Sequence, residues 1–351
     1  MLETKLITFK NWVSENGIID KRFEYVNQKL TYYFDEFLDN HRALPMYEDY
    51  FNAITKCNEL KFDCFTEVEA YVKLYFLERY RRFSLIFVDL IPNRIKINKE
   101  ILMLDIATGP GAAMYALNDV FNMYKIYLEE NNIKNDITLN IKYIEQSTYF
   151  REFLHKFTEI LNLNNLDEKW LYKIPFHFEL EDDYIKIHSN INIDKGYYDF
   201  QKPKYSFNLI VSSYFFTDIN NLEYFGDSII KTIKYLKNNG RMIIIGANAG
   251  NNVYTKIYEE LKTKITQHNY GTKKFIGNCR LEFTKKYTFD TQEDEILNSI
   301  YDIRFNYIVS DLIGIKDKQE YNELILKLNK RTINVTELLG FIRYSKFRKK
   351  I

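Results

Sequence analysis

Apolar and polar positions in the first ninety residues of the chain follow a helical period. Between residues 20 and 40, an apolar or aromatic side chain recurs at every third or fourth position. These positions are Phe23, Val26, Leu30, Tyr33, Phe34, Phe37 and Leu38. A second run with the same period covers residues 68–90 and ends before Pro92. Because no strand alternation or glycine-rich turn occurs here, the pattern predicts a helical N-terminal region over residues 1–95.

The hydrophobic pattern changes at residue 100. Residues 100–106 form a compact apolar run that is followed by a glycine-rich turn, and a helical pattern then covers residues 112–129. An alternating strand pattern covers residues 137–144, and another helical pattern covers residues 148–161. A strand, a glycine turn and a helix in this order open an α/β unit.

Strand and helix patterns continue to alternate as far as residue 250. The apolar run at residues 205–212 is nearly continuous, which is typical of a strand buried on both faces. We therefore expect a mostly parallel sheet with helices on both faces. The remaining expected elements are strands over 184–193, 241–245, 275–289 and 304–309, helices over 222–236, 253–266 and 319–329, and a turn at Asn238-Asn239-Gly240.

Composition and charge limit the class of protein. The chain has 351 residues, enough for about two domains of roughly 150 residues or one domain with an extension. Apolar residues make up 46% and charged residues 28%, as in a soluble globular protein. Lys and Arg total 49 against 48 for Asp and Glu, so the net charge of +1 gives no overall attraction to nucleic acid or membrane. An anionic partner would have to meet a local patch.

Cysteine and histidine positions give no sign of a metal site. Cys57, Cys64 and Cys279 have no CxxC spacing, and free thiols in a reducing cytoplasm are the plain interpretation. None of the five histidines has the spacing of a metal-binding pair. His188, on the expected third strand, is a candidate for catalysis or an ordinary structural histidine. The N-terminus lacks a signal-peptide pattern, and Asp89 interrupts the apolar run at residues 83–91, so we expect a cytoplasmic protein without a membrane span.

The strongest local motif follows the first expected strand and reads Asp105-Ile106-Ala107-Thr108-Gly109-Pro110-Gly111. Open α/β sheets bind ligands at the carboxyl ends of their strands. Gly109 and Gly111 carry no Cβ, so a ligand can approach the backbone closely, and the next helix begins near Ala112 with free N–H groups. Asp105 can accept a hydrogen bond from an amine or hydroxyl. A plain structural turn with two glycines is the alternative.

Glu145 stands at the end of the second expected strand, where a carboxylate can accept hydrogen bonds from both hydroxyls of a ribose. An ordinary surface glutamate is the alternative. A nicotinamide dinucleotide site fits less well, because the third glycine of its fingerprint is Met114 here. Glu145 also comes 34 positions after Gly111, where that fingerprint expects an acidic residue about 20 residues on.

The segment LDIATGPGAA and a following strand that ends in IEQS resemble the class I S-adenosylmethionine-dependent methyltransferase superfamily. NLIVSSYFF is similar to its fourth-strand motif and YLKNNGRMIII to its fifth-strand segment, so the resemblance covers about residues 96–250. It implies a Rossmann-like α/β sandwich with S-adenosyl-L-methionine as cofactor. Ala107 departs from the superfamily, which most often has glycine there. The resemblance assigns cofactor-binding positions to Asp105, Ala107, Gly109, Gly111, Glu145, Gln146 and Ser212, with Glu145 at the ribose and Gln146 beside the adenine.

Residues just past the fourth strand are expected to face the transferred methyl group. Ser213-Tyr214-Phe215 lacks the prolines of the N/D-P-P-Y/F motif in amino-methylating nucleic-acid enzymes, and the chain has no Pro-Cys dipeptide for cytosine-C5 chemistry. Tyr214 is a candidate to position an acceptor or act as a weak base. Packing under the N-terminal helices is an equal alternative for Tyr214.

A second resemblance lies upstream, where AYVKLYFLERYRRFSLIF is similar to the ribosomal small-subunit methyltransferase-like family. Members of that family place a helix that bears Tyr and Arg just before the glycine loop. They also tend to carry a cysteine cluster that binds iron–sulfur, which this sequence lacks. Basic residues with interleaved aromatics would suit RNA contact, as at Arg79, Arg81 and Arg82. Two further basic clusters occur at residues 273–286 and 346–350.

The sequence thus predicts a helical cap over residues 1–95 and a cofactor-binding α/β domain over residues 96–351. The cap is expected to cover the carboxyl edge of the sheet and to form the acceptor pocket with Tyr214 and Phe215. A small-molecule acceptor is the first interpretation. An RNA acceptor, transfer of the aminocarboxypropyl group and a catalytically silent assembly factor remain open, as does the oligomeric state.

Overall fold

The computed structural model describes twelve stretches of the chain and three further residues, and the elements below refer to these parts. The stretches are residues 8–38, 42–56, 60–95, 99–163, 168–172, 207–215, 235–247, 253–271, 277–289, 294–312, 318–330 and 335–346, with residues 222, 232 and 233 in addition. The strand expected over residues 184–193, His188 and most of the helix expected over residues 222–236 lie outside these ranges.

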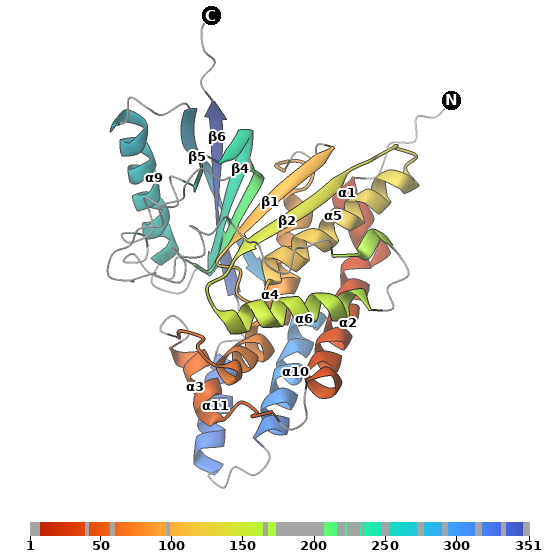
Figure 1. The fold of residues 1–351 in the computed structure, drawn as a ribbon, viewed down its shortest axis with the longest axis vertical. Coiled ribbons are helices and arrows are strands. Elements are labelled where there is room, and N and C mark those ends of the chain that lie inside the picture. Colours follow the sequence, from red (N-terminus) through yellow and green to blue (C-terminus); the bar gives the residue numbers. More distant parts are fainter. Residues whose placement is uncertain are drawn as a thin grey trace, which may run out of the picture.

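A central sheet of six described strands organises the molecule (Figure 1). The strands are β1 (Glu100–Ile106), β2 (Thr138–Ile144), β3 (Phe207–Ser213), β4 (Leu236–Ala247), β5 (Gly277–Phe289) and β6 (Val335–Lys346). Their order is β2-β1-β3-β4-β6-β5. The first four are parallel, and β6 runs antiparallel between β4 and β5. The carboxyl ends of β1, β2 and β3 therefore share one edge of the sheet, which we call the carboxyl edge.

Helices cover both faces of the sheet. The helices on one face are α1 (Phe9–Asn16), α2 (Ile18–Tyr32), α4 (Phe65–Leu90), α5 (Ala112–Glu130) and α6 (Thr148–Asn162), while α9 (Val253–Gly271) lies on the other (Figure 1). Successive residues of β1 face opposite sides, so Met103 packs with α4 and α5 whereas Leu104 packs with α9. This arrangement confirms the expected α/β, Rossmann-like sandwich.

A helical group lies beyond the carboxyl edge, at the bottom of Figure 1. It contains α3 (Tyr47–Thr55), α10 (Glu295–Asp311) and α11 (Lys318–Lys330), which share a hydrophobic cluster with the first half of α4. Tyr50 and Leu74 from the N-terminal part pack there with Ile308 and Leu324 from the C-terminal part. The helices next to the carboxyl edge therefore come from both ends of the chain.

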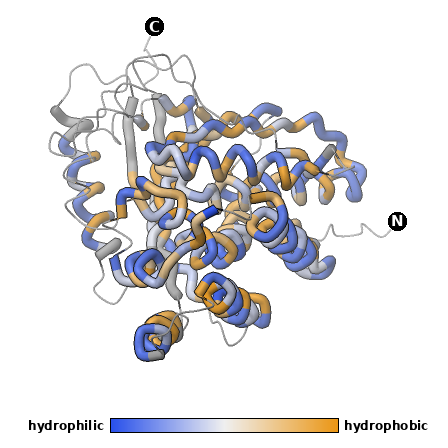
Figure 2. The backbone as a smooth tube through the Cα atoms, turned by 60° about the horizontal axis from the view of Figure 1, so that its bottom comes forward, coloured by the Kyte–Doolittle hydropathy of each residue, from blue (hydrophilic) through white to orange (hydrophobic). Residues whose placement is uncertain are grey.

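The N-terminal helices also share the main core of the sheet. Phe23 and Leu30 of α2 belong to one cluster with residues of α5, α6 and the strands. Figure 2 shows hydrophobic and hydrophilic positions interleaved along the helices of the molecule, as expected for amphipathic helices that pack on a core. None of the described helices is both long and apolar enough to cross a membrane.

A buried polar cluster joins α2 to α5 and α4. The Arg22 guanidinium lies 3.0 Å from the Asp119 carboxylate, and both side chains are buried. The Tyr80 hydroxyl donates to Asp119 at 2.5 Å, and the Tyr172 hydroxyl donates to it at 2.7 Å. The carboxylate is thus surrounded by donors from three separate segments, which fixes α2 against the sheet-packing helices.

Three sequence expectations need correction in the second half of the chain. The strand expected over residues 304–309 is wrong, because these residues belong to α10. Asp294 caps that helix by accepting from two backbone N–H groups, and Ile300, Arg304 and Ile308 are buried at four-residue spacing. Strand β6 was not expected. The residues of the expected turn, 238–240, lie inside the span of β4, where they interrupt its pairing with β3. Phe207 pairs with Leu236 and Leu209 pairs with Arg241, so the register shifts between these two pairs.

Candidate functional site

Hydrogen bonds from Thr108 hold the glycine-rich loop after β1 at the carboxyl edge. Thr108 donates its N–H to the Ile144 carbonyl of β2 at 3.2 Å, and its hydroxyl donates to the Asp105 carbonyl at 3.2 Å. Ala107 and Gly109 have left-handed backbone conformations with φ of 55° and 54°. These conformations reverse the chain between β1 and α5, so the loop presents its backbone at the edge of the sheet.

The two glycines of the loop have different surroundings. A Cβ on Gly109 would meet no atom of the described residues within 4 Å, so the backbone there faces open space among them. A Cβ on Gly111 would lie 2.7 Å from Leu154 Cδ2 and 2.8 Å from Tyr115 Cε2. Gly109 therefore has the open approach that a ligand needs, whereas Gly111 is required for packing of α5 against α6. The sequence motif did not distinguish these two reasons for glycine.

Asp105 at the end of β1 is fully buried. Neither of its carboxylate oxygens has a hydrogen-bond partner among the described residues. Burial, and to a lesser degree the nearby Glu145 charge, raises the pKa of Asp105 well above its usual value. A buried carboxyl group without partners is costly, and a cationic or donor group of a ligand would remove the cost.

Glu145 follows β2 and binds the loop directly. Its carboxylate accepts from the Gly109 N–H at 2.7 Å and from the Ser147 N–H at 2.9 Å. Burial raises the pKa of Glu145, although these N–H groups act in the opposite direction. A carboxylate has about four lone-pair positions, so two bonds leave room for two more donors. The structure thus brings Asp105, Gly109 and Glu145 together.

The other residues expected at the cofactor lie near the same edge. Ser212 is buried beside Ile106 in the register of β1 and β3, and its hydroxyl has no hydrogen-bond partner among the described residues. Gln146 is exposed next to Glu145. Ala107 lies in the loop itself. Their roles in cofactor binding remain predictions.

Tyr214 lies directly after β3 with a left-handed backbone, φ 56°. This conformation is uncommon for a bulky residue and often marks a functional position. Its ring lies under the Arg79 guanidinium of α4, 4.0 Å from ring centre to Cζ, and its hydroxyl accepts from Arg82 at 3.1 Å. Tyr214 therefore packs under an N-terminal helix, as one of its two interpretations expected. Phe215 packs with the cluster on the α9 side of the sheet.

Arg79 forms the centre of an aromatic cradle that the sequence analysis did not identify. Besides Tyr214, its guanidinium lies 5.1 Å from the Tyr71 ring centre and 4.8 Å from that of Tyr75, and it donates to the Tyr71 hydroxyl. The available signal was the four-residue spacing of Tyr71, Tyr75 and Arg79, which places them on one face of a helix. Glu78, the neighbour of Arg79 in the chain, forms ion pairs with Arg82 and Arg304.

Part of the N-terminal region also reaches the residues next to Glu145. The Ser147 hydroxyl donates to the Phe62 carbonyl at 2.8 Å, and the Phe62 and Phe150 rings lie 4.8 Å apart. Residues before position 95 thus approach the carboxyl edge beside both Glu145 and Tyr214. Within the described part of the chain, no three His, Cys, Asp or Glu side chains gather as a metal site would require.

Comparisons with known proteins give matches only among solved structures. No family model matches the chain, and no curated protein matches it. The cyclopropane synthase MmaA2 from Mycobacterium tuberculosis is 11% identical with a TM-score of 0.41, over 86% of this chain and 96% of that one. Coclaurine N-methyltransferase bound to N-methylheliamine and SAH is 9% identical with a TM-score of 0.38, over 96% and 95%.

Haemonchus contortus phosphoethanolamine N-methyltransferase 2 in complex with S-adenosyl-L-methionine is 12% identical with a TM-score of 0.36, over 82% of this chain and 60% of that one. At these identities and TM-scores the likeness carries no argument about activity or substrate.

Proposed function

We propose that this protein is an S-adenosyl-L-methionine-dependent methyltransferase that acts on a small-molecule acceptor. The observation that carries the proposal is the convergence of Asp105, Gly109 and Glu145 at the carboxyl ends of neighbouring parallel strands. Among the described residues, neither carboxylate oxygen of the buried Asp105 has a hydrogen-bond partner, and none approaches the backbone at Gly109 on its open side. These features fit a ligand that brings a cationic group and two hydroxyls.

In this proposal each residue has a separate task. Asp105 accepts from the ammonium group at the methionine end, and Glu145 accepts from the two ribose hydroxyls with its remaining lone pairs. Gly109 lets the cofactor lie against the loop, while Gln146 borders the adenine. The bound cofactor supplies an electrophilic methyl group on a sulfonium. The protein mainly has to align an acceptor with that methyl group and keep water away.

The acceptor side is proposed to lie at Tyr214, under the helices of the N-terminal region. Arg79, Arg82 and Phe83 of α4 all contact Tyr214. This supports a cap formed by residues 1–95, to which α10 contributes Arg304 through its ion pair with Glu78. Packing of helices over the carboxyl edge favours an acceptor small enough to be enclosed.

Ion pairing on α4 weakens the RNA alternative. Arg81 pairs with Asp20 at 2.5 Å and with Asp294 at 3.5 Å, and Arg82 pairs with Glu78. Two of the three arginines in this basic cluster are therefore paired with carboxylates of the same chain. A helix face built to bind phosphates would leave these charges available.

The cofactor proposal is tested by calorimetry with S-adenosylhomocysteine on ligand-stripped protein. The substitution Glu145→Gln keeps the size of the side chain but removes its charge and one acceptor oxygen. We expect the dissociation constant to rise about tenfold or more, because hydrogen bonds to a charged group contribute ~1.5–3 kcal/mol. Glu152→Gln, an exposed carboxylate on α6 paired with Lys156, is the matched control and should leave binding unchanged.

Failure of the unmodified protein to bind the cofactor product at millimolar concentration would overturn the proposal. Two labelled cofactors distinguish the remaining alternatives. Label from the methyl carbon that is retained in the acceptor indicates methyl transfer. Label from the aminocarboxypropyl chain indicates transfer of that group instead. Tight binding without turnover of any acceptor would support the assembly-factor alternative.

A further inference from the structure

Arg79 is a partly exposed cation that forms no ion pair with any described residue. Its Nη1 group donates to the Tyr71 hydroxyl, and its other contacts are with the rings of Tyr71, Tyr75 and Tyr214. These partners are neutral phenols, so they orient the guanidinium plane without cancelling its charge. The aromatic cradle of Arg79 therefore holds a positive charge that a ligand can use.

Two donor groups of Arg79 are accessible in the described part of the chain. Its Nε and Nη2 groups have no acceptor among the described residues, and these residues do not enclose them. Arg81 on the same helix differs, because it is buried and forms ion pairs with Asp20 and Asp294. The edge of a guanidinium that carries Nε and Nη2 matches the two oxygens of a carboxylate.

The aromatic cradle of Arg79 reaches the carboxyl edge on both sides of β1. On one side, Tyr214 directly follows β3. On the other side, the Tyr71 ring lies 4.9 Å from the Phe62 ring, and the Phe62 carbonyl accepts from Ser147 after β2. Since β1 lies between β2 and β3 in the sheet, the proposed cofactor site at the end of β1 lies between these two contacts.

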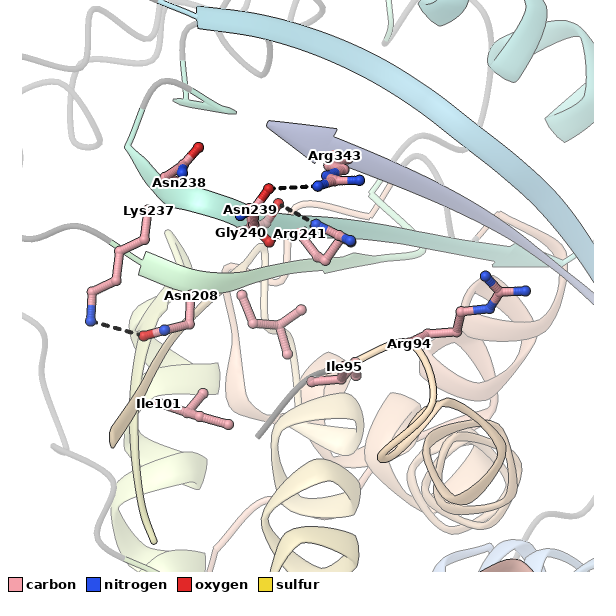
Figure 3. Close-up of a pocket in the computed structure, with 11 residues that line it drawn as sticks. Arg94, Ile95, Ile101, Asn208, Lys237, Asn238, Asn239, Gly240, Arg241 and Arg343 are labelled. Carbon is pink, nitrogen blue, oxygen red and sulfur yellow. Dashed lines mark hydrogen bonds between the residues drawn. The ribbon is translucent and has the colours of Figure 1, made fainter. Parts of the chain in front are cut away.

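Another group of cations lies far from this edge. They line a pocket of about 390 Å³ where the parallel strands begin, and they are Arg94, Lys237, Arg241 and Arg343 (Figure 3). Ile101 of β1 lines the same pocket, and four residues of strand, about 13 Å, separate it from Asp105. These cations are therefore too distant to bind a small acceptor at Tyr214.

We propose that Arg79 binds the carboxylate of the methyl acceptor and that this acceptor is a small aromatic carboxylic acid. The proposal rests on the proposed methyltransferase function. The tyrosine rings offer apolar contact for the body of such an acid, next to paired donors for its charged group. A carboxylate held there would orient the acceptor beside Tyr214, which the proposed function places at the transferred methyl group.

The proposed cofactor carries a carboxylate as well, so two sources of the same chemistry have to be separated. Arg79 contacts Tyr214 after β3, and among the described residues it has no contact with the loop after β1. In the proposed function the methionine end of the cofactor lies at that loop. The position of Arg79 therefore favours the carboxylate of the acceptor.

The first test compares 4-fluorobenzoate with its neutral isostere 4-fluorobenzamide in fluorine NMR titrations of the full chain saturated with S-adenosylhomocysteine. We expect the benzoate to bind about tenfold or more tightly, because only the carboxylate accepts charge-assisted hydrogen bonds. Arg79→Gln should abolish this preference. Arg94→Gln, which removes a guanidinium at the opposite edge of the sheet, is the matched control and should preserve it.

Arg79→Lys keeps the charge but loses the planar fork, so it should reduce the preference for the benzoate in part. This variant replaces Arg79→Gln if circular dichroism shows that Arg79→Gln does not fold. A preference that survives in the folded variant would overturn the proposal. Absence of any preference in the unmodified protein would do the same, as would tighter binding of inorganic phosphate than of 4-fluorobenzoate.

Calorimetry with S-adenosylhomocysteine on the same variants separates the two carboxylates. Its dissociation constant should be the same in Arg79→Gln, Arg94→Gln and the unmodified protein. A rise in Arg79→Gln alone would assign Arg79 to the cofactor carboxylate and overturn the proposal. Failure of the unmodified protein to bind S-adenosylhomocysteine would overturn the proposed function together with this inference, whereas intact binding without a preference for the benzoate would overturn only the inference.

Discussion

Ala107 occupies a backbone conformation that favours glycine. Its φ of 55° is left-handed, and an L-residue with a Cβ is disfavoured there by roughly 1–2 kcal/mol. We expect Ala107→Gly to raise the free energy of unfolding by up to about 1 kcal/mol, because added freedom of the unfolded chain offsets part of the relief. Chemical denaturation measures this. Ala116→Gly in the interior of α5 should have the opposite effect, and a loss of stability in both variants would show that Ala107 is not strained.

The buried carboxyl group of Asp105 should make the stability of the protein depend on pH. Its pKa is raised in the folded state, so the folded protein holds a proton that the unfolded chain releases near pH ~4. Stability without ligand should therefore fall as pH rises from that value through the raised pKa. Asp105→Asn should remove much of this fall, and its advantage in melting temperature over the unmodified protein should be larger at pH 8 than at pH 5. A smaller dependence of stability on pH should remain in Asp105→Asn, because the pKa of Glu145 is also raised. A pH-independent difference would contradict the assignment.

At the scale of elements, the junction of α5 and α6 depends on Gly111. A Cβ there would approach Leu154 and Tyr115 to less than 3 Å, and φ of 80° adds backbone strain. We expect Gly111→Ala to lower the free energy of unfolding by about 2–3 kcal/mol. Gly109→Ala is the matched control, because its Cβ would enter open space at a similar φ. Gly109→Ala should lower the free energy of unfolding less than Gly111→Ala does, but it should weaken cofactor binding. Equal losses of stability in the two variants would contradict the packing role of Gly111.

At the scale of the whole molecule, the Arg22–Asp119 pair ties the N-terminal region to the sheet domain. Replacing one partner of a buried pair leaves an uncompensated charge, which costs about 3–5 kcal/mol. Arg22→Met should therefore destabilise strongly in chemical denaturation, and adding Asp119→Asn should restore part of the loss. Lys156→Met, which breaks an exposed pair, should change stability by less than about 1 kcal/mol. A small effect of Arg22→Met would mean that the N-terminal helices contribute little to the common core.

The long periodic segments and the first strands could be predicted from the sequence. The strand at Glu100–Ile106 was recognisable because a buried strand requires a run of apolar residues. The loop and the helix after it were recognisable because the glycines and the helical period of apolar residues also lie within a short segment. The strand Val335–Lys346 was missed, since its position depends on pairing between β4 and β5. Residues 304–309 were expected as a strand because a short apolar run fits both periods, and burial in the helical group selects the helix.

The α/β class, the position of Asp105 and Glu145 at strand ends and that of Gly109 in the following loop could be read from local sequence, because strand and turn chemistry act over a few residues. Only the tertiary structure decided that Gly111 serves packing, that Arg79 rests on Tyr214, and that Arg94, Lys237, Arg241 and Arg343 meet in one pocket. These relations join residues far apart in the chain. The register of the sheet and the packing of helices on its faces set them, and no local pattern records either one.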